Sequence, residues 1–139
     1  MDYKIPYISL ILVFLISVVS CTNQATENIP VDKTVLTNEL ALYYYNLKVK
    51  GNTTAFVDGM LSCDSTPHTY KLRMKEMIQH HQKILKREKR GVDSIHVSRM
   101  TYNKCRDMAY VFLHISYKDK TQEEVIFPLV FSNNEWKIR

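Results

Sequence analysis

The spacing of the apolar residues changes at Gly91, and this change sets the fold class. Before Gly91, apolar side chains recur every three or four residues, which is the spacing of one helical face. After Gly91 they alternate with polar side chains in the segments SIHVSRMTYN, MAYVFLHISY, EEVIFPLVF and EWKIR, as in half-buried strands. The sequence therefore predicts an α+β fold with helices first and strands second.

Three helices are predicted before Gly91. The first covers residues 35–50 and ends at Gly51, which suits a left-handed cap. The second is a short helix within NTTAFVDGML. The third begins at Ser65-Thr66-Pro67, where a hydroxyl cap precedes a proline in the first turn, and it runs to about residue 90.

The four predicted strands are joined by short polar turns, so they should form an antiparallel meander. The second and third strands are rich in apolar residues on both faces. In the second strand, Ala109, Val111, Leu113 and Ile115 share one face, and Met108, Tyr110 and Phe112 share the other. The helices can cover only one face. The other face is expected to meet a protein partner such as a second copy, a bound ligand, or the rest of a strongly curled sheet.

Residues 1–20 are predicted to be an export signal. Their apolar run is too short for a bilayer, which needs roughly 20 apolar residues, but it suits a secretory signal. The run ends in Val18-Val19-Ser20-Cys21, which resembles the lipobox of bacterial lipoproteins. The resemblance implies that Cys21 is lipidated and becomes the first residue of the mature chain. We therefore expect a lipid anchor in the cell membrane or the outer membrane, with the domain facing the periplasm or the exterior.

Two alternatives remain for this segment: an uncleaved anchor, or an ordinary signal followed by a coincidental cysteine. Residues 21–32 are polar and are interpreted as the lipidated cysteine and a flexible tether. Residues 33–139 then form a single domain. In an exported domain, Cys63 and Cys105 could form a disulfide, and the alternative is two separate reduced thiols.

The net charge of +5 is concentrated in one segment. Residues 70–90 contain eight basic and two acidic residues, a balance of +6, so the rest of the chain sums to −1. This basic helix face is either a solvated surface or a surface that attracts anionic headgroups. Because the excess is local and the chain is exported, no nucleic-acid partner is expected.

The order of the predicted elements resembles the nuclear transport factor 2-like (SnoaL-type) superfamily, and more narrowly small bacterial lipoproteins with that fold. The residues that carry the resemblance are ALYYYNLKVKGNTTAFVDGM and YKDKTQEEVIFPLVFSNNEWKIR. The resemblance implies three helices packed on a curved meander, which together enclose a cone. Catalytic members hold an Asp/His pair or an equivalent polar group inside the cone. Asp58, Asp107 and His114 are loose candidates for such a group, but none lies in a recognisable motif, so no catalytic residue is assigned.

The predicted pocket of this cone includes Tyr44, Phe56, His114 and Phe127. A cone filled by the aromatic residues favours a non-catalytic binding or scaffolding module for a partner protein or a small apolar ligand. An open cone with a buried Asp or His favours a small pocket enzyme, an acid-base isomerase or hydrolase acting on a hydrophobic substrate. The first function is the main expectation. No cofactor is expected, and no metal site, although Met74, Met77 and His81 share a helix face that would suit a soft ion.

Overall fold

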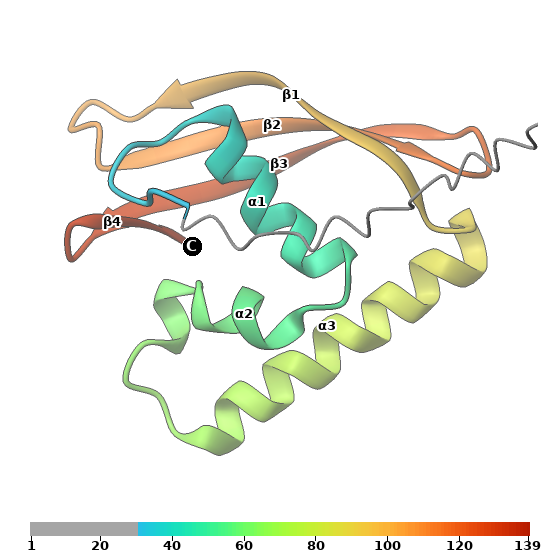
Figure 1. Cartoon of the computed structure of the whole chain (residues 1–139), viewed down its shortest axis with the longest axis horizontal. Helices are drawn as coiled ribbons and strands as arrows, with labels where there is room; N and C mark the ends of the chain where they lie inside the picture. Colours follow the sequence, from blue (N-terminus) through green and yellow to red (C-terminus); the bar gives the residue numbers. More distant parts are fainter. Residues whose placement is uncertain (1–30) are drawn as a thin grey trace, which may run out of the picture.

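The computed structural model describes residues 31–139, which form a four-stranded antiparallel sheet with helices on one of its faces (Figure 1). The elements are α1 (Asn38–Val49), α2 (Thr53–Asp58), the 3-10 turn η2 (Leu61–Cys63), α3 (His68–Lys89), β1 (Val92–Tyr102), β2 (Met108–Tyr117), β3 (Gln122–Ser132) and β4 (Glu135–Ile138). The strands lie in the order β1-β2-β3-β4, so every strand pairs with its neighbour in the chain. The predicted α+β class and the antiparallel meander are confirmed.

Short polar side chains and glycines set the ends of the helices. The Thr37 hydroxyl accepts a hydrogen bond from the Leu40 amide at 3.1 Å, and the Asn52 side chain accepts one from the Ala55 amide at 3.3 Å. These caps satisfy amide groups that have no partner inside α1 and α2. Gly51, with φ of 80°, ends α1 as predicted. The third helix differs, because Arg90 takes the left-handed conformation at its end with φ of 61°, just before Gly91, and no side chain caps its start at Pro67.

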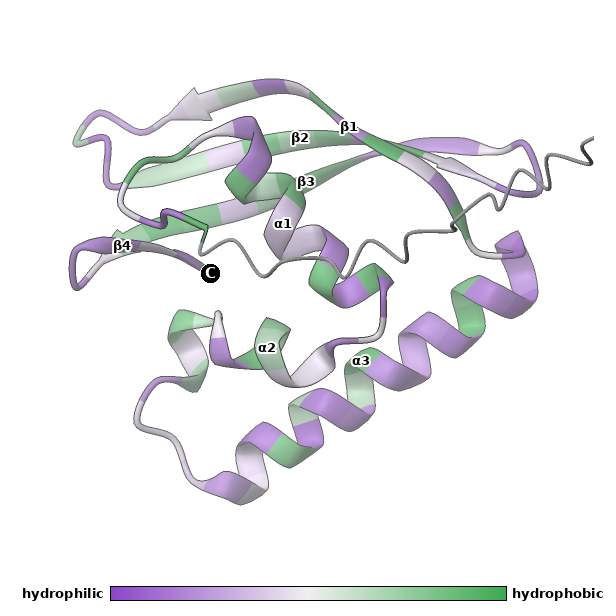
Figure 2. Cartoon of the chain, viewed as in Figure 1, coloured by the Kyte–Doolittle hydropathy of each residue, from purple (hydrophilic) through white to green (hydrophobic). Residues whose placement is uncertain are grey.

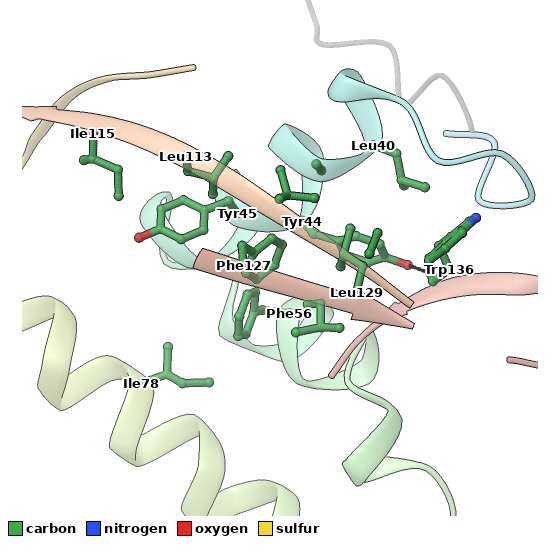
Figure 3. Close-up of a cluster of buried hydrophobic side chains, with 14 of the residues drawn as sticks. Leu40, Tyr44, Tyr45, Phe56, Ile78, Leu113, Ile115, Phe127, Leu129 and Trp136 are labelled. Carbon is green, nitrogen blue, oxygen red and sulfur yellow. Dashed lines mark hydrogen bonds between the residues drawn. The ribbon is translucent and has the colours of Figure 1, made fainter. Parts of the chain in front are cut away.

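The hydrophobic core lies between α1, α2 and the inner face of the sheet (Figure 3). The inward residues of β2 are fully buried: Ala109, Val111, Leu113 and Ile115. Tyr44 of α1 packs against them, and its hydroxyl donates a hydrogen bond to the Trp136 carbonyl at 2.7 Å. Gly59 makes room for this ring, because a Cβ at that position would lie 2.8 Å from Tyr44 Cε1.

The third helix lies farther from the sheet than α1 (Figure 1). Ile78 is its one buried side chain, and most of α3 is hydrophilic (Figure 2). The helix packs on α2, and its C-terminal end is joined to the β2–β3 turn by two backbone hydrogen bonds. The Lys118 amide donates to the Gly91 carbonyl at 3.0 Å, and the Asp119 amide donates to the Lys89 carbonyl at 3.2 Å. In residues 31–139, no helix combines the length and the apolar character that a membrane span requires.

Candidate functional site

The interior of the cone is filled by aromatic side chains. Tyr44, Phe56 and Phe127 come together as predicted, but all three are buried in the core. The ring of Tyr45 packs edge-to-face on Phe127, with the two ring centroids 5.4 Å apart. Within residues 31–139, neither an aspartate nor a histidine is buried. The arrangement is that of a packed core, and the cavities of the domain lie outside it.

The structure corrects the expected place of His114, which does not share the pocket of the three aromatic residues. Side chains alternate along β2, so His114 lies on the face opposite the buried Leu113 and Ile115. Its ring stacks near that of His96, with centroids 4.8 Å apart, and its Nε2 lies 3.2 Å from the side-chain oxygen of Gln122. His114 is therefore a residue of the outer face of the sheet.

The two aspartates that were loose catalytic candidates also lie outside the cone. Asp58, at the end of α2, forms a surface ion pair with Lys71 at 3.3 Å. Asp107, in the β1–β2 turn, accepts a hydrogen bond from the Asn103 side chain at 2.6 Å. Neither carboxylate approaches His114 in the way an acid-base pair requires, since each is engaged by a different neighbour.

A cavity lies instead between α1 and α3. Lys48 of α1 and three residues of α3, Met77, Ile78 and His81, line a cavity of about 240 Å³. Glu123 of β3 acts electrostatically on both Lys48 and His81. We call these five residues the cone mouth.

Burial and charge set the protonation of the cone mouth. Burial lowers the pKa of Lys48, and the carboxylate of Glu123 opposes this effect. Burial, followed by the nearby charge of Lys48, lowers the pKa of His81 below its usual value of 6.5. The imidazole is therefore neutral at pH 7 and can accept a hydrogen bond. Across the mouth, burial and a hydrogen bond donated to Glu123 raise the pKa of Tyr117, which keeps its hydroxyl protonated.

The outer face of the sheet carries a continuous apolar surface. Its apolar residues form three cross-strand pairs: Met108 with Val130, Tyr110 with Pro128, and Phe112 with Ile126. The exposed fraction is 37% for Tyr110 and 55% for Ile126. The helices described by the structure all lie on the other side of the sheet (Figure 1). We call these six residues the outer apolar face.

Charged side chains border the outer apolar face. The guanidinium of Arg99, on β1, stacks on Phe112, with its central carbon 3.9 Å from the ring centroid. Glu124 of β3 pairs with His114 of β2, and its carboxylate extends toward β1, where it accepts a hydrogen bond from the Ser98 hydroxyl at 2.8 Å. Aromatic residues, methionine and arginine are enriched in protein interfaces, so the composition of this face suits protein binding.

The cysteines are placed apart. Cys63 is buried in η2, Cys105 is exposed in the β1–β2 turn, and both are free thiols. The structure therefore has the alternative of two separate thiols and not the Cys63–Cys105 disulfide. The predicted lipidation residue, Cys21, lies outside the described residues. In the described part of the chain, no three histidine, cysteine, aspartate or glutamate side chains are grouped as metal ligands.

Sequence reasoning did not identify Lys48 and Glu123 of the cone mouth, or Arg99 and Glu124 beside the outer apolar face. Lys48 and Glu123 belong to a helix and a strand far apart in the chain, and no local pattern links them. Arg99 is different, because it follows a register shift between Val97 and Arg99 that moves its side chain to the outer face. A register shift of this kind is hard to recognise from the alternation of apolar and polar residues in the sequence.

Comparison with known proteins supports the fold. No protein-family model matches the sequence, and no curated protein shows significant sequence similarity to it. A solved structure from Campylobacter jejuni, described as a candidate NTF2-like transpeptidase, superposes with a TM-score of 0.58 and 15% sequence identity. The match covers 72% of this chain and 94% of the neighbour. The domain is thus similar in fold to an NTF2-like protein, as the order of its helices and strands implied.

Proposed function

We propose that this protein is a membrane-anchored lipoprotein of the bacterial cell envelope whose domain is a non-catalytic binding or scaffolding module. The outer apolar face is its binding surface. The observation that carries the proposal is a row of three apolar cross-strand pairs on β2 and β3, opposite a core filled by its own aromatic residues. Tyr110 and Ile126 of these pairs are exposed, and the other four side chains are half-buried. Exposed apolar surface of this kind is costly in water and marks interaction sites.

The partner that we propose is a second copy of the chain. In a two-fold dimer with the sheets face to face and the axis parallel to the strands, the apolar pairs of the two copies meet at the centre of the interface. A two-fold interface needs such self-complementarity, because each contact occurs twice. Sheets packed in this way are common in proteins and are about 10 Å apart.

The proposed anchor rests on the signal-like segment and the lipobox resemblance at Cys21. At about 0.8 kcal/mol for each buried CH₂, two or more acyl chains hold a protein stably on a membrane. Mass spectrometry of the mature protein tests this part of the proposal. The expected product begins at Cys21 with acyl chains on the residue, and a product that retains residues 1–20 or begins with an unmodified Cys21 would reject it.

The binding surface is tested by sedimentation velocity of the purified full-length protein in detergent. Wild-type protein is expected to sediment as a dimer. Ile126→Glu places a carboxylate in the centre of the interface, where its desolvation is expected to weaken the dimer about a hundredfold. Because Ile126 is 55% exposed in a single copy, the substitution should leave the fold intact.

Met77→Glu is the matched control. Met77 is 58% exposed, nearly the same as Ile126, but it lies on α3, away from the outer apolar face. The Met77→Glu variant should therefore sediment as the wild type does. A monomeric wild type, or a dimer unaffected by Ile126→Glu, would show that this face is not a self-association surface.

The cone mouth supports a second candidate function, that of a small pocket enzyme. The specific feature is the cavity that His81 and Lys48 line together, where burial lowers the pKa of His81. The structural neighbour is described as a transpeptidase, and peptide exchange needs an activated nucleophile as well as a base. Loss of hydrolysis of p-nitrophenyl acetate in His81→Ala would favour the enzyme, whereas equal rates in the variant and the wild type would favour the binding module.

A further inference from the structure

A second cavity, of about 290 Å³, lies where α3 ends and β1 begins. Its apolar wall is formed by Val49, Leu85 and Val92, which come from α1, α3 and β1. Three cationic residues line the same cavity: Lys86 and Arg90, at the end of α3, and Lys118, which follows β2. No carboxylate is among its lining residues. The cavity thus combines an apolar wall with a positively charged rim.

The backbone at the end of α3 is joined to the turn after β2. Arg90 has a left-handed conformation with φ of 61°, which turns the chain out of α3. The Lys118 amide donates to the Gly91 carbonyl at 3.0 Å, so the residue after β2 is joined to the residue after Arg90. The fold therefore brings the backbone of Arg90 and Lys118 together at the cavity, and their side chains are exposed.

Two neighbouring basic residues, Arg87 and Lys89, already have polar partners, whereas the three basic residues at the rim form no ion pair within the described residues. Arg87 forms an ion pair with Glu88 at 3.3 Å, and the Lys89 ammonium donates to the Thr121 hydroxyl at 3.1 Å. In the described part of the chain, Lys86, Arg90 and Lys118 form no ion pair.

Asp119, an acidic residue in the turn after Lys118, is bound to Thr121. Its carboxylate accepts hydrogen bonds from the Thr121 amide at 2.9 Å and from the Thr121 hydroxyl at 2.6 Å. Its carboxylate interacts electrostatically with the charge of Arg90, and the two side chains form no ion pair. Three like charges around a partly enclosed space repel one another and concentrate a positive field there, and a bound anion relieves both effects.

We propose that this cavity binds a small amphiphilic anion, with a phosphate or carboxylate group between Lys86, Arg90 and Lys118 and a short apolar body against Val49, Leu85 and Val92. The cavity volume of about 290 Å³ lies near the lower end of the range for small-molecule sites, roughly 300–1,000 Å³, which suits a compact ligand. The cavity lies on the helix side of the sheet, so this site is independent of the outer apolar face.

The probes are 4-fluorophenyl phosphate, an aryl phosphate of the proposed class, and 4-fluorophenol, which lacks the anionic group. Binding to the full-length protein in detergent is followed by fluorine NMR, with empty micelles as the blank. The wild type is expected to bind the phosphate more tightly than the phenol. Lys118→Glu should weaken phosphate binding at least about tenfold, because it reverses one of three charges at the rim, and should leave phenol binding unchanged.

Lys104→Glu is the matched control, since Lys104 is also an exposed turn lysine, but in the β1–β2 turn, away from this cavity. It should bind the phosphate as the wild type does. Equal weakening by Lys104→Glu and Lys118→Glu would overturn the site, because only the net charge would matter. Vesicles of phosphatidylglycerol and phosphatidylcholine distinguish the source of the anion. If Lys118→Glu weakens vesicle binding but not probe binding, the proposed cavity ligand is rejected in favour of a membrane surface.

Discussion

Tyr44 connects three parts of the fold through one side chain. It belongs to α1, its ring is approached by Gly59 after α2, and its hydroxyl donates to the Trp136 carbonyl of β4. Its placement explains why the cone is closed at this point, because the ring occupies the space that a ligand would need. Burial raises the pKa of Tyr44 from the usual 10.0 to about 12, so the hydroxyl remains a donor over the whole neutral range.

Replacing Tyr44 by Phe should lower the free energy of unfolding by about 1 kcal/mol at pH 7, because the Trp136 carbonyl loses a buried partner. The difference in the free energy of unfolding between the wild type and Tyr44→Phe should shrink between pH 10 and pH 12. In that interval the unfolded wild type releases the tyrosine proton and the folded protein keeps it, so the wild type loses stability as the pH rises and the variant lacks this loss. Urea unfolding at the two ends of the range measures both effects. Tyr43→Phe serves as the control at a less buried tyrosine, and a difference that is constant with pH would contradict the account.

At the scale of the elements, α3 is the least firmly held helix. It is 22 residues long, yet only Ile78 is buried, and its other anchors are its contact with α2 and the backbone bonds at its C-terminal end. By contrast, α1 buries four residues against the sheet. Helices with little buried surface open more readily than the rest of a domain. Both cavities are lined by α3, so its movement would change their shape.

We expect Ile78→Ala to weaken the packing of α3 more than that of α1. The free energy of unfolding should fall by about 2 kcal/mol. This value is at the low end for a buried isoleucine, because the surrounding side chains are only partly buried. Hydrogen exchange of the α3 amides should accelerate, and that of the α1 amides should change little. The adjacent Met77→Ala is the control, since Met77 is largely exposed and should leave exchange unaltered. Equal acceleration in α1 and α3 would mean that α3 is an integral part of the core.

The sequence predicted most elements, because their signals are local. The period of apolar residues and the two glycine stops placed α1, α3 and the four strands within a few residues. The site was harder to predict, since it depends on which face a residue occupies. The alternation that buries Leu113 and Ile115 already assigns His114 to the other face, so its place could have been deduced. The bond between the Lys118 amide and the Gly91 carbonyl could not be deduced, because it joins two turns far apart in the chain and no periodicity encodes it.

At the scale of the whole molecule, the two faces of the sheet differ in what covers them. The inner face carries the helices (Figure 1), and the core lies between them and the sheet. The outer face carries aromatic and aliphatic side chains, of which Tyr110 and Ile126 are exposed. The proposed lipid anchor would confine the protein to a surface, where copies of the chain would meet more often than in free solution. Such confinement would favour association through the outer apolar face.

Hydroxyl-radical footprinting of the intact protein in its membrane tests this central claim most directly. Tyr110 on the outer apolar face and Tyr70 on α3 form a matched pair, with exposed fractions of 37% and 41% in a single copy. If the outer face is covered by a partner, Tyr110 is modified markedly more slowly than Tyr70, and Ile126→Glu restores its rate. Equal rates for the two tyrosines in the wild-type protein would contradict the account.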